Sequence, residues 1–299
     1  MNRFFRNIRL YRIQSAWPQD EVGLSQALDG AAFKPCGTFN ERSSGFEAPV
    51  EGAGDALCRS LMGADLLQLR VQSRIIPVAA VQEALTERME AYRSRTRTEP
   101  SRRERRELKE EIYGQLLPQA LLKSDRVQAA YLRQQGVLAI GTASETATEN
   151  FLQNLARGMV GLKYIPLSFD KAPTELLNKV FLGGQSGSLT LGREARMRDP
   201  SDPGTSVNWL DVDLADEAVR RHIVEGMRLD RLGMVLDGML TFVLDENLVF
   251  RKLRLADQEE AVVEEEDPLA QHDAYFVVMM GAIQALLSAL EEALGNPVS

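Results

Sequence analysis

Two histidines and one glycine-rich loop are the parts of this 299-residue chain that could support catalysis. His222 and His272 belong to no HExxH or HxH pattern and to no cluster with cysteine, so their spacing does not favour a metal site. The loop 183–188 reads GGQSGS. Measured from Gly184 and Ser186, Ser188 stands where a GxSxG nucleophile elbow requires its second glycine. We therefore expect a non-enzymatic protein without cofactor or metal. A hydrolase that uses Ser186 and a histidine is the least favoured alternative.

An arginine cluster in residues 93–106 is the most informative feature of the sequence. The segment RSRTRTEPSRRERR carries seven arginines and two glutamates, a local charge of +5. Arginine forms bidentate contacts with phosphate, and clustered cations that release counterions supply much of the affinity for DNA. The alternative interpretation is a solvated helix turn with i,i+4 ion pairs such as Arg106–Glu110.

The overall charge argues at first against nucleic acid, since the chain carries −8 at pH 7 and its pI is near 5.1. However, residues 256–299 hold ten acidic residues and neither lysine nor arginine, so residues 1–255 carry +2. Local fields guide a partner, and the total charge does not. The acidic run 259–267 is either a solvated loop or a repulsive rim that keeps phosphates off the outer surface. Two cysteines, Cys36 and Cys58, and an opening without signal-segment character indicate a cytoplasmic location.

Local patterns predict the elements that hold these residues. In the first third of the chain we expect a strand near 4–13, a helix over 20–33, a loop over 35–54 and one or two strands over 66–77. Helices from 78 to about 95 and from 101 to about 117 then form a hairpin with the arginine cluster at its tip. Ser101 and Glu104 make a capping box for the second helix.

The remainder mixes strands and helices without steady alternation, which favours the α+β class with mixed or antiparallel sheets. We expect a long surface loop over 193–206 and an antiparallel meander over 228–255, with a turn at Asp237-Gly238. The predicted divisions are an N-terminal α/β unit 1–77, a helical finger 78–123, and a central and C-terminal α+β region 124–299.

The last helix begins at the cap Asp267-Pro268 and is apolar nearly all round over 275–290. It is too short and too interrupted to favour a membrane span, and we expect no membrane partner. Burial in the core is the first interpretation. The alternative is a dimer interface that includes Val278, Ile283 and Leu287.

Short motifs along nearly the whole chain resemble those of the bacterial recombination-associated protein RdgC family. In order, they are FKPCG at 33–37, GF at 45–46 with Pro49, IP at 76–77, LLP at 116–118, APT at 172–174, HI at 222–223 with Gly226, RKL at 251–253, and DA at 273–274 with Phe276. Each motif is short, and their shared order and spacing carry the resemblance.

The resemblance implies a non-catalytic, nucleoid-associated protein that encircles duplex DNA as a ring-shaped homodimer and also binds single-stranded DNA. It further implies little sequence preference and restraint of RecA-type strand exchange. The hairpin over 78–117 looks like the family's protruding finger. The alternative function is a protein-interaction module that acts directly on the recombinase through its acidic and apolar C-terminal surface.

The predicted DNA-binding residues form two sets. The arginine cluster supplies Arg93, Arg95, Arg97, Arg102, Arg103, Arg105, Arg106 and Lys109. The resemblance supports three of these, Arg97, Arg106 and Lys109, and adds Lys123, Arg228 or Arg231, Arg251, Lys252 and Arg254. Leu121 falls where family members carry an aromatic residue suited to wedging between bases. A leucine can act as an apolar wedge, but it cannot stack as an aromatic ring does.

Overall fold

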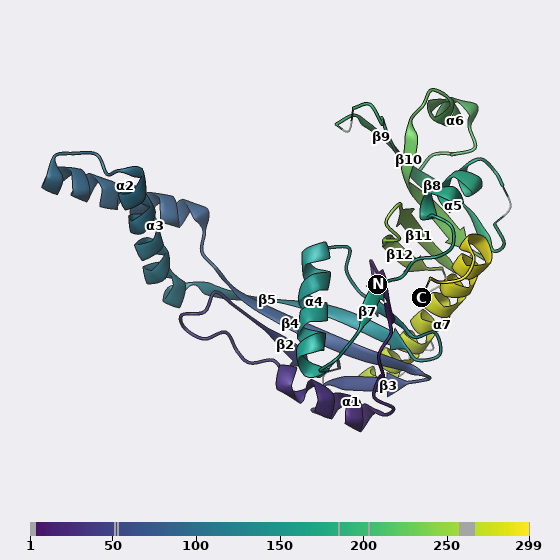
Figure 1. Ribbon diagram of the computed structural model, residues 1–299, viewed down its shortest axis with the longest axis horizontal. Coiled ribbons are helices and arrows are strands. Elements are labelled where there is room, and N and C mark those ends of the chain that lie inside the picture. The colour runs from purple at the N-terminus through teal and green to yellow at the C-terminus, as the bar shows by residue number, and fades with distance from the viewer. Residues whose placement is uncertain are drawn as a thin grey trace. The chain divides into compact units, whose positions relative to one another are not determined.

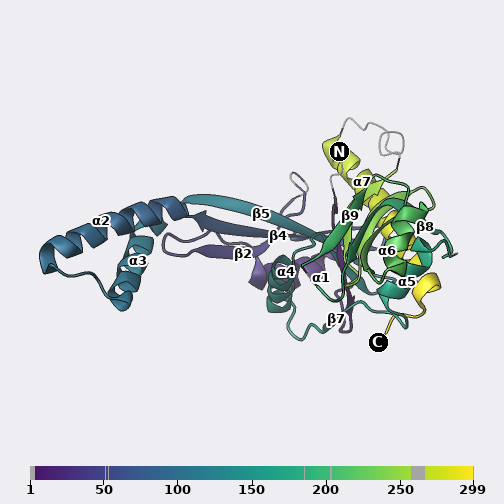
Figure 2. The same ribbon diagram turned by 90° about the horizontal axis from the view of Figure 1, so that it is seen from above.

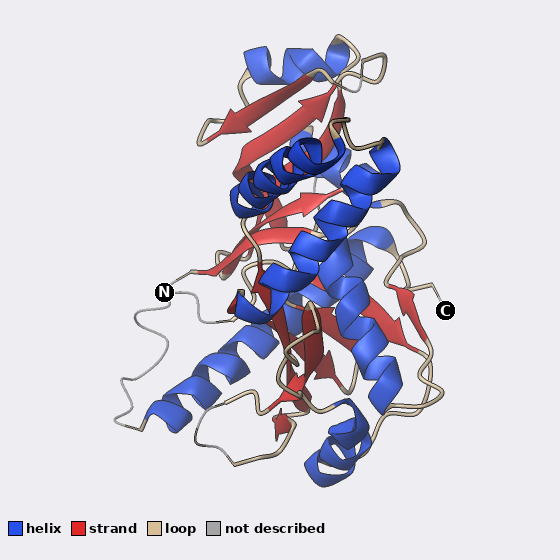
Figure 3. Ribbon diagram, turned by 90° about the vertical axis from the view of Figure 1, so that its left-hand side faces the viewer, coloured by secondary structure: helices blue, strands red, loops and turns tan. Residues whose placement is uncertain are grey.

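The computed structural model describes residues 4–50, 52, 54–184, 186–202, 204–256 and 267–298. The chain forms two compact units (Figure 1). The first unit comprises Met1–Gly30, Ala48–Gln68 and Val127–Ser299, and the second comprises Ala31–Glu47 and Leu69–Arg126. Helices and antiparallel sheets occur together, which confirms the predicted α+β class (Figure 3).

One sheet has seven strands in the order β2-β4-β5-β6-β1-β7, with β3 paired to β4. Their bounds are β1 Arg9–Ile13, β2 Arg42–Glu47, β3 Cys58–Leu61, β4 Ala64–Ile75, β5 Leu121–Leu132, β6 Val137–Ile140 and β7 Tyr164–Pro166. β1 pairs antiparallel with β6 and β7, β3 with β4, and β5 with β6. The division between the two units falls within β4 and within β5.

β2 lies inside the segment 35–54, which the sequence analysis assigned wholly to a loop, so that assignment was wrong for residues 42–47. Phe46 is fully buried, and its carbonyl accepts a hydrogen bond from the Phe33 amide at 2.7 Å. The approach is close enough that a Cβ on Gly45 would lie 2.5 Å from the Cα of Phe33. A pairing partner distant along the chain therefore makes this glycine-containing segment a strand.

The other sheet is antiparallel and lies in the first unit, in the order β12-β11-β10-β8-β9. Its strands are β8 Leu189–Arg198, β9 Ser206–Leu210, β10 Arg228–Leu236, β11 Leu240–Asp245 and β12 Phe250–Leu255. The meander β10-β11-β12 confirms the prediction, and Asp237 and Gly238 form its first turn with positive φ angles of 44° and 69°. The predicted surface loop over 193–206 was wrong for residues 193–198, because Ala195 and Met197 alternate into the core as β8 requires.

The helices are α1 Glu21–Leu28, α2 Val78–Thr96, α3 Arg102–Leu116, α4 Glu145–Gly158, α5 Pro173–Phe181, α6 Glu217–Val224 and α7 Pro268–Leu294. α7 meets the length and composition of a membrane span, with a mean hydropathy of 1.6, but half of that window is buried inside the structure. Its buried residues join β-strand residues in the core of the first unit. Burial within the chain accounts for the apolar composition, as the first interpretation proposed.

The predicted start of α7 is confirmed, because the Asp267 side chain accepts a hydrogen bond from the Leu269 amide and Pro268 opens the helix. Ile283 and Leu287 are 0% and 3% exposed, within the core of their own chain. Neither offers a surface to a second copy, which corrects their assignment to a dimer interface. Val278 is half-buried, so the interface prediction rests on this residue alone.

A buried carboxylate, Asp65, holds several segments of the first unit together. Asp65 is 0% exposed and accepts hydrogen bonds from Trp17 Nε1 at 2.9 Å, Ser60 Oγ at 2.5 Å and Arg133 Nη2 at 2.7 Å. The Trp17 ring stacks on Tyr131 with centroids 4.0 Å apart. The carboxylate at the start of β4 is thereby joined to β3, to the residue after β5 and to the segment before α1.

Replacing Asp65 by asparagine should lower the free energy of unfolding by about 3 kcal/mol, because the partly buried Arg133 loses its counter-charge. Asp211→Asn is the matched control: its ion pair with Arg193 has the same 2.7 Å distance, but both side chains are mostly exposed. The control should cost less than about 1 kcal/mol. Urea denaturation of both variants measures the difference, and equal costs would contradict the assigned role of Asp65.

Candidate nucleic-acid interface

The helices α2 and α3 form the predicted hairpin in the second unit (Figure 2). Val81 and Leu85 of α2 pack with Ile112 of α3. α2 ends where Arg97 adopts a left-handed conformation with φ of 55° and donates its amide to the carbonyl of Arg93. The arginine cluster therefore occupies the end of α2, the connection and the first turns of α3. All seven of its arginines are exposed.

Glu104 fixes the geometry between the two helices. Its carboxylate accepts from the backbone amide and hydroxyl of Ser101, which confirms the predicted capping box, and also from the hydroxyl of Tyr92 on α2. The Tyr92 hydrogen bond, followed by those from Ser101, lowers the pKa of Glu104 to about 2. One glutamate of the arginine cluster thus has a structural role and holds the tip of the hairpin together.

The structure separates the cluster into arginines with and without a carboxylate partner. Arg93 Nε lies 2.7 Å from Glu99, Arg103 Nε 2.9 Å from Glu107, and Arg106 Nε 2.8 Å from Glu110. The i,i+4 pair of Arg106 is the one named as the alternative interpretation of the sequence. Among the described residues, no carboxylate lies within ion-pair distance of the other cations of this set: Arg95, Arg97, Arg102, Arg105 and Lys109.

The position of two unpaired arginines is electrostatically unfavourable for the isolated chain. Arg102 and Arg105 lie in the first two turns of α3, where the amide dipoles of a helix favour anions and disfavour cations. An anionic ligand bound here would interact favourably with both the arginine side chains and the N-terminus of the helix. The two arginines therefore do not stabilise the hairpin through the helix dipole, but they favour the binding of an anionic partner.

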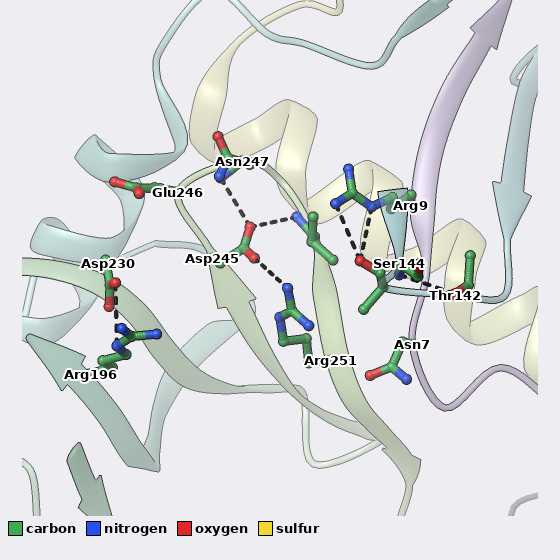
Figure 4. Close-up of polar contacts among 12 residues, drawn as sticks. Asn7, Arg9, Thr142, Ser144, Arg196, Asp230, Asp245, Glu246, Asn247 and Arg251 are labelled. Carbon is green, nitrogen blue, oxygen red and sulfur yellow. Dashed lines mark hydrogen bonds and ion pairs between the residues drawn. The ribbon is translucent and has the colours of Figure 1, made fainter. Parts of the chain in front are cut away.

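Apart from Lys123, the second predicted set lies on the five-stranded sheet of the first unit, and there two of its five cations are paired. Arg251 lies 3.3 Å from Asp245, and Lys252 Nζ lies 2.7 Å from Glu194 (Figure 4 shows the Arg251 pair). In the part of the chain that the structure describes, Arg228, Arg231 and Arg254 have no carboxylate within ion-pair distance. These three residues are the available cations of this set.

The sequence analysis missed two arginines of this sheet. Arg196 and Arg198 on β8 lie opposite Arg231 and Arg228 on β10. Asp230, which is 4% exposed, lies 2.7 Å from Arg198 and 3.6 Å from Arg196 and offsets part of the repulsion between these neighbours (Figure 4 shows the Arg196 contact). The alternation of arginine with Ala195 and Met197 was the signal that could have found them.

Two residues lie at the beginning of β5, in the second unit. The Lys123 ammonium lies 2.9 Å from Asp125, so this predicted cation is neutralised locally. Leu121 exposes 80% of its surface and has the accessibility that an apolar wedge needs.

Among the described residues, Ser186 Oγ has no hydrogen-bond partner. The Ser186 side chain is buried, the His222 ring packs 5.4 Å from Trp209, and the His272 ring packs 4.8 Å from Phe4. No group of three or more His, Cys, Asp or Glu residues suited to a metal ion occurs among the described residues. Of the acidic run 259–267, only Asp267 falls within the described residues, so the run's predicted role lies outside them.

Fold and site together define an α+β protein of two units that displays unpaired cations on a helical hairpin. The profile of a family described as "Putative exonuclease, RdgC" matches residues 3–297. Recombination-associated protein RdgC of Pseudomonas aeruginosa is 32% identical over 298 residues, which cover 98% of this chain and 97% of that protein. The proteins of the same name from Halorhodospira halophila and Xanthomonas campestris are 29% and 30% identical, each with at least 97% of both chains covered. The chain belongs to the RdgC family, which confirms the resemblance.

The role of Tyr92 in holding Glu104 can be tested by titration. Tyr92→Phe removes the largest cause of the lowered pKa, so the Glu104 midpoint should rise from about 2 toward its ordinary value of 4.5. A depressed pKa stabilises the hairpin above the ordinary value, and this contribution is lost as the pH falls from about 4.5 toward 2. NMR titration of the carboxyl carbon measures the midpoint. Tyr113→Phe on α3 is the control, and a midpoint unchanged in both variants would contradict the assignment.

Proposed function

We propose that this protein binds DNA without sequence preference, as a ring-shaped homodimer that encircles duplex DNA and restrains RecA-type strand exchange during recombination. One observation carries the proposal: five cations on the α2–α3 hairpin have no carboxylate partner among the described residues. Two of these cations lie in the first two turns of a helix, where the helix dipole favours an anionic partner. The names of the curated relatives support an association with recombination.

The proposed binding is non-catalytic, although the family description contains the word exonuclease. Arginines that contact phosphates and helix termini that attract them account for binding without cleavage. We place the protein in the cytoplasm, on the nucleoid, with duplex and single-stranded DNA as ligands and without a membrane partner.

The pairing pattern of the arginines gives a direct test. Arg102→Ala with Arg105→Ala removes two unpaired cations, whereas Arg103→Ala with Arg106→Ala removes two that are paired to glutamates on the same helix. The first double variant should weaken duplex binding more, and the slope of log affinity against log salt should fall by about 1.8, or 0.9 per lost phosphate contact. Fluorescence anisotropy with duplexes of unrelated sequence between 50 and 200 mM salt, roughly the range over which such contacts matter, measures both.

Three outcomes of this experiment would contradict the proposal. Affinity that does not change with salt would exclude phosphate contacts as its source. Equal losses in the two double variants would show that pairing does not decide which arginines contact DNA. Cleavage of the duplex in the presence of Mg²⁺ or Mn²⁺ would show that binding is not the whole activity.

The dimer part of the proposal is tested by sedimentation velocity. The wild-type protein should sediment as a dimer, and Val278→Asp should shift it to a monomer with an unchanged circular dichroism spectrum, because Val278 is only half-buried in its own chain. Ile283→Asp is the contrasting variant and should unfold the protein, since Ile283 is 0% exposed. A wild-type monomer at high concentration would overturn the ring.

A further inference from the structure

The apolar ring of Phe39 is largely exposed to solvent. It exposes 79% of its surface, whereas the chain's other aromatic side chains, all of them among the described residues, are buried or partly buried. Burial of a phenyl ring stabilises a fold, so an isolated ring in water forgoes that gain. Single exposed apolar residues are common on proteins, and exposure alone carries no conclusion. The way in which the backbone holds this ring distinguishes it.

The turn that carries Phe39 is anchored at both ends. The Asn40 amide donates to the Gly37 carbonyl at 3.1 Å, which places Phe39 at the third position of a tight turn. Before the turn, the Cys36 amide donates to the buried side chain of Gln72 at 2.9 Å. After it, the Asn40 carbonyl accepts from the Cys36 thiol at 3.0 Å. These contacts fix the backbone on either side of the ring, so ordering it for a ligand costs little entropy.

A single guanidinium joins this turn to the segment that carries Leu121. Arg74 on β4 donates from Nε and Nη2 to the Gly37 carbonyl, at 3.4 and 3.3 Å. Its Nη1 donates to the carbonyls of Pro118 and Ala120, at 3.3 and 3.2 Å. Phe39 comes two residues after Gly37, and Leu121 directly follows Ala120. Both exposed apolar residues are therefore close in the sequence to carbonyls that bind the same guanidinium.

The same turn borders a groove with a free cation on its rim. Glu41, whose carbonyl accepts from the Arg74 amide at 2.9 Å, lines a groove of about 420 Å³ together with Lys109, Glu110, Tyr113 and Leu117 of the α3 region, and Glu110 is itself paired with Arg106. Lys109 is one of the cations for which the described residues offer no carboxylate within ion-pair distance. Aromatic, apolar and cationic groups thus meet at one place within the second unit.

We propose that Phe39 is a stacking platform for unpaired DNA bases, with Leu121 beside it and Lys109 neutralising the adjoining phosphate. This inference rests on the proposed function, and it adds a base-contacting site to the phosphate-contacting arginines. Aromatic rings beside cations are the common means by which proteins hold single strands, since every base offers a π-face irrespective of sequence. Duplex bases already stack on each other and gain little from the ring, so the site favours single strands.

The surroundings of Phe39 favour a nucleic acid over a protein partner. A stable protein interface buries about 800 Å² on each side and needs a broad patch. Here the exposed apolar groups are few, and exposed charged residues flank them: two cations, Lys34 and Arg42, and one carboxylate, Glu41, lie within five residues of Phe39 in the sequence. Arg42 has no carboxylate within ion-pair distance among the residues that the structure describes. A second copy of the chain is the competing occupant, and the experiment below detects it.

The test compares Phe39→Ala, Phe39→Trp and the control Val160→Ala, which truncates a residue of the first unit that is 95% exposed. The probe is a single-stranded oligonucleotide of mixed sequence that contains 2-aminopurine, whose fluorescence is quenched on stacking. Phe39→Ala should weaken the affinity for the single strand about fivefold or more. It should also abolish the additional quenching of 2-aminopurine that wild-type protein causes when it binds. Phe39→Trp should retain both, and Val160→Ala should change affinity by less than about twofold. Duplex affinity and its salt dependence should stay near wild type in all three variants.

The outcomes separate this inference from the proposed function. If wild-type protein binds DNA but Phe39→Ala behaves like Val160→Ala, the stacking site is wrong and the arginine interface stands. Equal losses on single strands and duplex would also overturn it, because they would indicate a general effect on binding. A change of sedimentation coefficient in Phe39→Ala would assign the ring to a contact between copies. If wild-type protein binds neither form of DNA, the proposed function itself is wrong.

Discussion

The structure depends most on the buried carboxylate of Asp65, because it fixes the position of the long strand β4. Three donors from separate segments converge on a side chain that no water reaches. A strand that slipped by one residue would turn every side chain to the opposite face, so a buried polar contact at its start sets the register of all that follows. Further along the same strand, Gln72 and Arg74 hold the turn of Phe39 and the segment before Leu121.

The distribution of charge explains how a protein with a net negative charge could bind an anionic ligand. On α3, Glu107 and Glu110 neutralise Arg103 and Arg106 and leave Arg102 and Arg105 unpaired. On the five-stranded sheet, buried Asp230 and Asp245 take up part of the arginine charge. The cations that remain after internal pairing are available to a partner. Five of them lie on the α2–α3 hairpin, two near a helix terminus that itself attracts anions.

The two kinds of contact proposed here have different physical origins and different consequences. Phosphate neutralisation by arginine is salt-dependent and indifferent to base identity and pairing. Stacking on Phe39 involves no charge, is insensitive to salt, and requires bases that are free of their partners. A protein that uses both would hold duplex DNA through one set and recognise the unpaired regions of recombination intermediates through the other. Restraint of strand exchange would then follow from occupation of the DNA, without a contact to the recombinase.

The sequence by itself determined the features that depend on neighbours along the chain. The capping box of Ser101 and Glu104, the Asp237-Gly238 turn and the start of α7 at Pro268 were predicted because a few adjacent residues decide them. The family was predicted from the order of short motifs. Tertiary structure decided that residues 42–47 and 193–198 are strands, because each pairs with a strand, β4 or β10, that does not follow it directly in the sequence. It also decided that Ile283 is core and that Phe39 stays exposed on a fixed turn. Pairing and burial depend on distances through space, and composition does not encode them.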